Sequence, residues 1–357
     1  MAGQAVRYII GADENGLGPR LGPMSVTAVL ARVTEQGDKV VRTKPRGGLR
    51  QRLGDSKGLV SHGNIALAEA WTRVLVERGH GKHSEGDSPD ELLDAVTLDS
   101  RVALTEPCPK HVTGQCWETE GEGFTPPDEM GDTMKLLAKD LDRLEKRGVE
   151  IVAVRSVVVC THRLNQAVAE GKSRFVVDLH AMERLILAFR DLAGEEVDAE
   201  CGKVGGFGQY GKVFGPLGGR LHAVMEEGRA RSAYRFPGIG DIAFVRDSDA
   251  SNLLVGMASL VGKYVRELMM ERIVRHYQRA DPELPVVSGY HDPVTNQFVL
   301  GTEALRRKRR VPNSCFERDK IGPPSSRAPS GAQRTSKRKK ARGKKAKRKA
   351  AQTELTS

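Results

Sequence analysis

The chain has 357 residues, enough for one large domain or two smaller ones with a substantial buried core. Its formal net charge of +11 comes from the end of the chain: residues 319–357 carry 13 Lys and Arg against 2 Asp and Glu, and residues 1–318 carry 44 of each sign. No stretch reaches roughly 18 consecutive apolar residues, and no charged start leads into a long apolar run, so we expect neither a membrane-spanning helix nor a secretion signal. A cytoplasmic location is therefore expected.

The first predicted elements are two strands and a helix. Residues 6–10 are a short β-branched run, and apolar residues alternate over 24–30, as in a strand with one buried face. Leu67, Trp71, Val74 and Leu75 fall at helical spacing, which predicts an amphipathic helix over about 63–79. Residues 80–130 are polar, rich in Gly and Pro, and poor in periodicity, so we expect an inserted surface segment there.

Cysteine usage indicates a reducing compartment, because the five cysteines are few and scattered. One cluster, Cys108, His111 and Cys116, invites comparison with zinc sites. Its spacing matches no familiar zinc module. A loop with incidental Cys and His is the favoured interpretation, and a metal site is the alternative.

The second half of the chain continues the alternation of strands and helices. Residues 151–160 predict a strand, the apolar spacing at 182–189 predicts a helix, and a third helix runs from about 257 to about 277. The Glu-Glu-Gly sequence at 226–228 could close a hairpin. This pattern indicates an α/β domain over residues 1–318 with a mixed central sheet.

Residues 319–357, with the core SKRKKARGKKAKRKAAQ, lack apolar periodicity and predict a disordered basic tail. Dense Lys and Arg on such a segment favour salt-sensitive attraction to phosphate backbones. A solubilising tail without a specific partner is the alternative. A second basic run, RRKRR at 306–310, would extend the same surface.

Asp13 and Glu14 are adjacent acids at the end of an apolar run, and alternating glycines follow them. An acidic pair that leaves a strand into a Gly-rich turn is a recurrent way to hold a divalent metal against a phosphate. Taken alone, such a pair is usually just solvated, and the glycines serve a tight turn with positive φ.

Further motifs accompany the acidic pair in a fixed order. They are DENGLG at 13–18, DSK at 55–57, HAMERLI at 180–186, DSD at 247–249, ASLVGKYVREL from Ala258, and SGYHDPVT at 288–295. Together they resemble the ribonuclease HII and HIII family over most of residues 7–300. In that family an acid precedes the Ser of the AS-x-x-x-K-x-x-R helix by ten residues, as Asp249 precedes Ser259 here.

The resemblance implies a ribonuclease H-like fold, with a mixed sheet flanked by helices, and a metal-dependent endoribonuclease. Such an enzyme hydrolyses the RNA strand of RNA–DNA hybrids or ribonucleotides embedded in DNA. By position, Asp13, Glu14 and Asp249 become catalytic ligands of Mg²⁺ or Mn²⁺, hard cations that select carboxylate oxygens. Asp247, two residues earlier, is a lesser candidate.

The resemblance also implies a set of substrate contacts. Gly16 and Gly18 match the glycines that let backbone amides approach the ribose 2′-hydroxyl, the group that distinguishes RNA from DNA. Leu17 stands between them, where ribonuclease HII has Arg and HIII commonly has Lys or Thr. Lys57 and Lys263 would face phosphates or support the site, and Tyr290 would abut the sugar.

The position of the remaining acid is open. In the family an Asp ends the strand that follows the HAMERLI-type helix, and the matching segment here reads EEVDAECGKVGG. Asp198 fits as catalytic residue and metal ligand if the strand ends early, with Glu200 as a substitute. If CGK replaces the family's DGN, Cys201 takes the place of the carboxylate, and a thiol is a poor ligand for Mg²⁺. A one-residue register choice decides which set faces the site.

Two other functions stay open besides the hybrid-cleaving enzyme. A catalytically weak or inactive relative would bind nucleic acid through the fold and the basic tail. A related nuclease would act on another substrate, such as structured DNA or RNA without a DNA partner.

Overall fold

The computed structural model describes residues 6–54, 56–80, 88–203 and 207–319. These lie in a compact unit that spans Met1–Ile321. The predicted basic tail, except for Asp319, falls outside the described residues, so its expected disorder stays a prediction.

The described strands form one mixed seven-stranded sheet with the order β3-β2-β1-β4-β7-β6-β5. β1 pairs antiparallel with β2 and parallel with β4, and β4 pairs parallel with β7. The strands are β1 (Val6–Asn15), β2 (Met24–Thr34), β3 (Val149–Val159), β4 (Val197–Gly202), β5 (Ala223–Glu227), β6 (Arg231–Phe236) and β7 (Gly240–Val245). Because β1, β4 and β7 are parallel, their carboxyl ends meet at one edge of the sheet.

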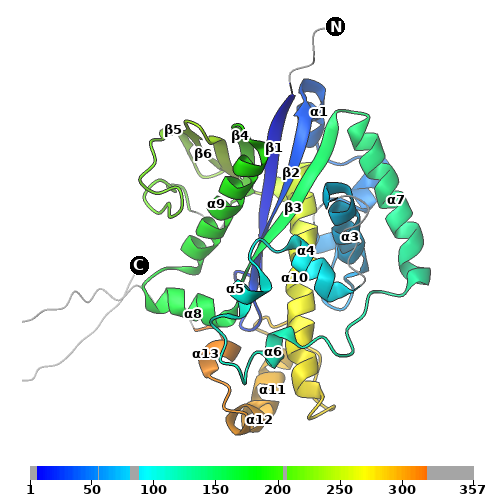
Figure 1. Cartoon of the computed structure of the whole chain (residues 1–357), viewed down its shortest axis with the longest axis vertical. Coiled ribbons are helices and arrows are strands. Elements are labelled where there is room, and N and C mark those ends of the chain that lie inside the picture. Colours follow the sequence, from blue (N-terminus) through cyan, green and yellow to red (C-terminus); the bar gives the residue numbers. More distant parts are fainter. Residues whose placement is uncertain (1–5, 55, 81–87, 204–206, 320–357) are drawn as a thin grey trace, which may run out of the picture. The chain divides into compact units, whose positions relative to one another are not determined.

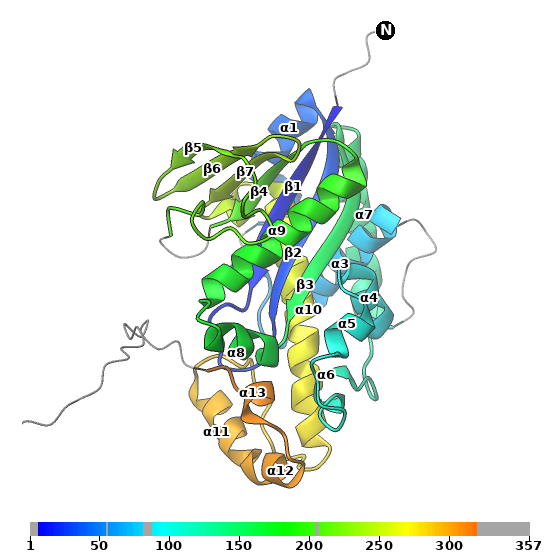
Figure 2. The ribbon, with the colours of Figure 1, turned by 60° about the vertical axis from the view of Figure 1, so that its left-hand side comes forward.

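The helices cover both faces of this sheet (Figures 1 and 2). They are α1 (Glu35–Val41), η1 (Gly47–Gln51), α2 (Ser56–Leu59), α3 (Ala66–His80), α4 (Pro89–Val96), α5 (Arg101–Thr105), α6 (Gly114–Trp117), α7 (Pro127–Glu145), α8 (Thr161–Ala169), α9 (Arg174–Ala193), η2 (Ser248–Ala250), α10 (Leu253–Gln278), α11 (Pro293–Gly301), α12 (Glu303–Lys308) and α13 (Asn313–Phe316).

Strand β1 is buried on both faces, which explains its continuous apolar run. Ile9 packs in the core that α3 and α10 cover, whereas its neighbour Ile10 packs on the opposite face beneath α9. Successive side chains of a strand point to opposite faces, so the run serves two cores at once. Gly11 is required here, since a Cβ at that position would lie 2.4 Å from the Leu254 backbone in α10.

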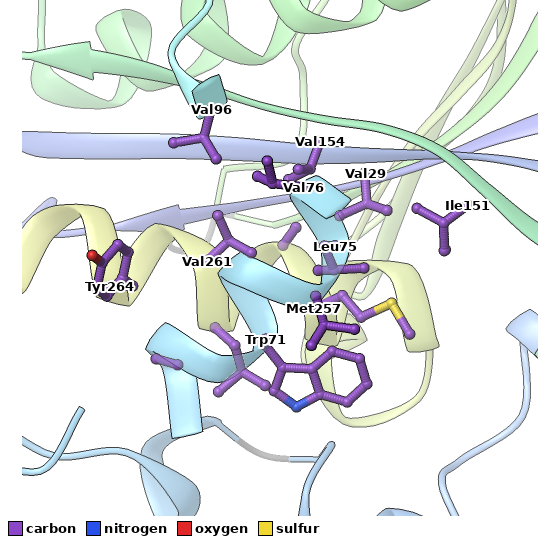
Figure 3. Close-up of a cluster of buried hydrophobic side chains, with 14 of the residues drawn as sticks. Val29, Trp71, Leu75, Val76, Val96, Ile151, Val154, Met257, Val261 and Tyr264 are labelled. Carbon is purple, nitrogen blue, oxygen red and sulfur yellow. The ribbon is translucent and has the colours of Figure 1, made fainter. Parts of the chain in front are cut away.

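The larger core lies between the sheet and the pair α3 and α10 (Figure 3). Trp71 and Leu75 of α3 pack with Met257 and Val261 of α10 in this core, and all four side chains are fully buried. The Trp71 indole Nε1 donates to the Arg52 carbonyl oxygen at 2.7 Å, which satisfies its buried polar group. The helical spacing that predicted α3 is therefore the spacing of its buried face.

The predicted α/β fold with a mixed sheet flanked by helices is confirmed. The strands and helices predicted at 6–10, 24–30, 63–79, 151–160, 182–189 and 257–277 correspond to β1, β2, α3, β3, α9 and α10. The hairpin predicted around the Glu-Glu-Gly sequence is also present, as β5 and β6. None of the described helices has the length and apolar character needed to cross a membrane.

The interpretation of residues 80–130 as a surface insert needs correction. The part of it that the structure describes contains α4, α5 and α6 and buries Leu92, Leu93 and Val96 in the core. Helix α6 lies against α10, and Glu122 forms an ion pair at 2.7 Å with the fully buried Arg272 side chain. The helices are too short for the spacing of apolar residues to stand out in the sequence.

Candidate active site

A cavity of about 660 Å³ opens at the edge where the parallel strands end. Its wall combines the ends of β1 and β4, the turn after β7, the middle of α10 and two loops. The lining residues are Asp13, Glu14, Asn15, Gly16, Leu17, Gly18, Val60, Ser61, His62, Gly202, Lys203, Asp247, Ser248, Asp249, Ser259, Lys263, Arg266, Glu267, Ser288 and Tyr290. Most of the residues that the sequence predicted for an active site are therefore brought together.

Asp13 occupies the centre of the acidic group. Burial raises the pKa of Asp13 to about 7, the nearby charges of Glu14 and Asp249 act in the same direction, and a hydrogen bond with Ser259 of α10 opposes them. Like charges that raise the pKa of one another are typical of carboxylates that share a site. Asp13, Glu14 and Asp249 thus converge from β1 and from the turn before α10.

Asp249 and Asp247 belong to the tight turn between β7 and α10. Asp247 has a positive φ of 55° and a side chain that is 83% exposed, whereas Asp249 is partly buried in η2. Asn252 then caps α10 by accepting a hydrogen bond from the Leu254 amide at 3.0 Å. Both acids line the cavity, and Asp249 is the one whose charge acts on Asp13.

The glycine turn after the acids is fixed by arginines that sequence reasoning missed. Gly16 has a positive φ of 93°, and a Cβ there would lie 2.9 Å from the Arg266 side chain, so this position requires glycine. Gly18 has neither constraint. Arg318, only 3% exposed, donates to the carbonyl oxygens of Gly16 at 2.5 Å and Gly22 at 2.9 Å. The turn is thereby tied to the end of the described chain.

The predicted substrate contacts lie around the rim of the cavity, with one exception. Lys263 lines it, and Tyr290 is half exposed there, with the guanidinium of buried Arg266 lying 4.9 Å from its ring centre. Leu17 also lines it, and the Leu17 amide donates to a carboxylate oxygen of Glu14. The side chain of Lys57 lies outside the described atoms.

His62 and Glu267 form a pair that the sequence did not single out. The His62 Nδ1 and the Glu267 Oε2 are 2.7 Å apart at the cavity wall. The only sequence signal was that Glu267 follows Lys263 by one helical turn of α10, which places both on one side of that helix.

Asp198 lies away from the cavity, which corrects its assignment as a catalytic and metal-binding acid. Its Oδ2 accepts a hydrogen bond from Arg7 Nη1 at 2.7 Å, four residues before the end of β4. Four residues of strand span about 13 Å. Glu200 points to the same face and pairs with Arg42 at 3.2 Å, so it does not substitute.

Cys201 does not replace the carboxylate either, because it is fully buried in the core beneath α9. Gly202 is the residue of this strand that reaches the cavity. Therefore β4 supplies no acidic side chain beside Asp13.

A buried acid comes instead from α9. Asp178 is 0% exposed, and neither carboxylate oxygen has a hydrogen-bond partner among the described residues. Burial raises the pKa of Asp178 well above its ordinary value, and the charges of Glu14 and Asp13 raise it further. The sequence did carry a signal, since Asp178 interrupts the helical apolar spacing that continues through Met182, Leu185 and Phe189.

The chemistry of these donors fits a hard divalent cation, because carboxylate oxygens are the ligands that Mg²⁺ and Mn²⁺ select. Burial of the Asp13 carboxylate, together with the smaller repulsion from Glu14 and Asp249, raises its pKa, and a bound cation would offset both effects. Within the described ranges, however, no three His, Cys, Asp or Glu side chains are grouped so that they could hold a metal ion as they stand.

The Cys and His cluster at 108–116 has a wider neighbourhood than the sequence indicated. Burial raises the pKa of Cys116 to about 12, with smaller contributions from Cys160, Cys108 and Cys315. These thiols therefore lie near one another, and all are free. Among the described side chains, these residues do not form a group of three that could hold a metal ion.

Comparisons with known proteins give structural matches alone. No protein-family model matches the sequence, and no curated protein matches it. Among solved structures, the chain is similar to ribonuclease HII of Archaeoglobus fulgidus, which was solved in a complex with PCNA. The identity is 13% and the TM-score 0.34, and the match covers 86% of this chain and 92% of that chain.

Two ribonucleases of the HIII type are similar to a comparable extent. Bst-RNase HIII in complex with Mn²⁺ has 12% identity and a TM-score of 0.36, over 84% of this chain and 71% of that chain. Aquifex aeolicus RNase H3 has 12% identity and a TM-score of 0.37, over 87% of this chain and 70% of that chain.

Proposed function

We propose that this protein is a metal-dependent endoribonuclease of the ribonuclease H type. Its substrate would be the RNA strand of an RNA–DNA hybrid or a ribonucleotide embedded in DNA. The observation that carries the proposal is the convergence of Asp13, Glu14 and Asp249 in one cavity with Lys263 and Tyr290 at its rim. The order of the motifs along the chain, which resembles that of ribonucleases HII and HIII, supports it.

Asp13, Glu14 and Asp249 would hold Mg²⁺ or Mn²⁺. A bound divalent ion supplies a nucleophilic water at neutral pH and stabilises charge on the leaving oxygen. The Ser259 hydroxyl orients the Asp13 carboxylate through their hydrogen bond. Lys263 lies where a phosphate entering the cavity would meet a positive charge, and Tyr290, held over Arg266, offers a ring face to a sugar.

Gly16, Leu17 and Gly18 would contact the ribose. Glycine is required at position 16 because the Arg266 side chain fills the space of a Cβ, whereas a Cβ at Gly18 would meet nothing within 4 Å, so the open space that supports a close approach of substrate lies at Gly18. Leu17 offers no charge for a phosphate, so recognition at this turn would depend on the amides and on the 2′-hydroxyl. Lys57 remains a proposed phosphate contact on the strength of the DSK motif.

The experiment that tests the proposal compares three substrates in Mg²⁺ and in Mn²⁺: an RNA–DNA hybrid, a DNA duplex with one embedded ribonucleotide, and double-stranded RNA. We expect cleavage of at least one of the first two and loss of it in Asp13→Asn and in Asp249→Asn, by about a thousandfold or more. Cleavage of double-stranded RNA alone would assign another substrate. Full activity in Asp249→Asn would remove this acid from the mechanism.

A second function is favoured by one specific observation. Because β4 presents Gly202 beside Asp13 and Asp198 lies elsewhere, the cavity has no carboxylate from β4, the strand that supplies one in the family. A catalytically weak or inactive relative would bind nucleic acid through the cavity and through residues 319–357. Binding of a hybrid without cleavage in either metal would support this alternative. In either case we propose nucleic acid as the partner and the cytoplasm as the location.

A further inference from the structure

A second cavity, of about 320 Å³, lies where the end of α1, the helix η1, the end of α7 and the start of α10 meet. Figures 1 and 2 show α1 and the end of α7 at the same end of the sheet. Five basic side chains line this cavity against one acidic side chain. They are Lys44, Arg46, Arg52, Arg143 and Arg147, with Asp140. We call it the arginine cavity.

The base of the arginine cavity is a buried ion-pair arrangement. Asp140 is 4% exposed and accepts hydrogen bonds from Arg52 Nε to its Oδ2 and from Arg143 Nη1 to its Oδ1, each at 2.8 Å. The backbone of Arg52 is held as well, because its carbonyl oxygen accepts the Trp71 indole hydrogen bond. A guanidinium fixed in this way has little conformational freedom left, so binding a ligand costs little further entropy.

The other three cations have no such partner among the residues that the structure describes. Lys44, Arg46 and Arg147 are exposed, and no residue in the described ranges forms an ion pair or a side-chain hydrogen bond with them. One carboxylate against five cations leaves a local excess of four positive charges. Residues 1–318 as a whole carry equal numbers of acidic and basic residues, so the excess is a local concentration and not a general basicity.

Such a cavity selects an anion that offers several oxygens. Guanidinium groups present N–H donors in a planar fork that matches a phosphate, and several of them around one concave surface favour a phosphodiester over a single carboxylate. The apolar side chains of Leu49, Leu144 and Leu253 line the same cavity and lower the local dielectric constant, which strengthens the attraction.

The position of the arginine cavity relates it to the active-site cavity. Leu253, the first residue of α10, lines the arginine cavity, and Ser259 and Lys263 of the same helix line the active-site cavity. From Leu253 to Ser259 the axis of α10 rises about 9 Å, and the two side chains point in directions about 120° apart, so both cavities border the same stretch of helix. The two cavities are therefore within reach of one nucleic-acid strand.

We propose that the arginine cavity binds a backbone phosphate of the nucleic acid whose scissile bond lies in the active-site cavity. This inference rests on the proposed function for the identity of the ligand. It adds a subsite, built from Arg46, Arg52 and Arg147, that would set the position of the strand relative to the acids.

The test compares a double variant, Arg46→Gln with Arg147→Gln, with the wild-type full chain. The probe is an 18-base-pair RNA–DNA hybrid in EDTA, so that binding is measured without cleavage. Loss of two of the cations that neutralise this phosphate should weaken binding about fivefold or more at 0.1 M salt and reduce the slope of log K against log salt by about one. The double variant should keep the wild-type melting temperature, since both side chains are exposed and form no ion pair with a described residue.

A matched control removes two exposed arginines elsewhere, Arg220→Gln with Arg229→Gln, and changes the net charge by the same amount. This control should keep wild-type affinity and salt slope. Equal losses in both double variants would show diffuse attraction of the basic protein to the hybrid and would overturn the subsite. Unchanged binding in the Arg46 and Arg147 variant would overturn it too.

Calorimetry with pyrophosphate distinguishes a nucleic-acid backbone from a free phosphate compound. Pyrophosphate binding that is lost in the double variant, without any effect on hybrid binding, would assign the cavity to a free phosphate compound and contradict the inference. The outcome is separable from that of the proposed function. If hybrid binding depends on Arg46 and Arg147 but the protein cleaves no substrate, the subsite is supported and the proposed function is not. If the protein cleaves the hybrid and the double variant binds it as well as wild type, the proposed function is supported and the subsite is not.

Discussion

Gly202 lies directly beside Asp13, and a Cβ at position 202 would be 2.5 Å from the Asp13 Oδ1. The parallel pairing of β1 with β4 places Ala12 opposite Cys201, so the next pair toward the cavity is Asp13 and Gly202. The Asp13 carboxylate thus occupies the space that a side chain on β4 would fill. The position of the Asp13 carboxylate therefore explains why residue 202 has no side chain.

Substitution of Gly202 by alanine should therefore act on Asp13. The added methyl group forces the Asp13 carboxylate to rotate, because 2.5 Å is far inside a van der Waals contact. We expect Gly202→Ala to lower the affinity for Mn²⁺ about fivefold or more, measured by calorimetry, with a small loss of stability. Gly123→Ala is the control, since a Cβ there meets nothing within 4 Å. Equal Mn²⁺ affinity in wild type and Gly202→Ala would show that Asp13 is not a ligand in this position.

Asp178 gives a prediction on stability. A buried carboxyl group without a hydrogen-bond partner destabilises the fold when it is charged, so Asp178→Asn should raise the free energy of unfolding by about 1 to 2 kcal/mol at pH 7.5 in urea titrations. The control is Asp191→Asn on the same helix, where the side chain is 73% exposed and we expect no change. Destabilisation by Asp178→Asn would mean that Asp178 is bound by a buried water or an ion that it needs.

The sign of the pH dependence follows from the raised pKa values. Burial raises the pKa of Asp13 to about 7, above the value of about 4 in the unfolded chain, so the folded state holds a proton that the unfolded state releases. The stability associated with Asp13 is fully present below about pH 4 and is lost as the pH rises toward 7. The free energy of unfolding of the wild type, relative to that of Asp13→Asn, should fall by about 4 kcal/mol over this window when no divalent metal is present.

Mn²⁺ should reverse this loss at pH 7.5. A cation that binds only the folded protein stabilises it in proportion to the logarithm of its concentration over the dissociation constant. We expect the wild-type melting temperature to rise with added Mn²⁺ and that of Asp13→Asn to stay nearly constant. A flat pH profile in the metal-free protein, with no response to Mn²⁺, would contradict both the raised pKa and the proposed metal site.

The sequence was most informative where one pattern has one structural meaning. The alternating apolar residues and the helical spacing of Trp71 and Leu75 located strands and helices, because each period fits only one regular structure. The acids at 13, 14 and 249 were also found, since ordered motifs constrain residues that are far apart. Their convergence in the cavity follows from the parallel pairing of β1, β4 and β7.

The site residues that the sequence could not assign depend on the register of a strand or on the surroundings of a single side chain. The segment 197–202 alternates acidic and apolar residues, so the sequence left open which set faces the cavity. The pairing of β4 with β1 places Gly202 at the cavity, and Asp198 forms a hydrogen bond with Arg7. Asp178 lies in α9, the helix of the HAMERLI motif, where a single acid on an apolar face does not by itself indicate a function. Arg318 had no signal at all, because it stands at the boundary of a long basic segment.

Arg318 leads to a prediction about where the folded unit ends. Its guanidinium binds the carbonyl oxygens of Gly16 and Gly22, and burial lowers its pKa to about 9, with the charges of Arg174 and Arg266 acting in the same direction. The Asp319 amide donates to the Asn165 Oδ1 at 2.8 Å, and Arg174 donates to the Asp319 carbonyl oxygen at 2.7 Å. The structural role of the chain thus extends through Asp319.

A chain shortened after Asp319 should keep the stability of the full chain, whereas a chain shortened after Glu317 should lose about 2 to 4 kcal/mol in urea unfolding. The loss arises because the carbonyl oxygens of the glycine turn lose a buried cationic donor. Arg318→Lys in the full chain serves as the matched variant, since it keeps the positive charge but lacks the forked guanidinium donors. Its free energy of unfolding should lie between those of the two shortened chains. Because the turn adjoins Asp13 and Glu14, the shorter chain should also bind Mn²⁺ more weakly. If both shortened chains were equally unstable, residues 320–357 would stabilise the body, and the role assigned to Arg318 would be wrong.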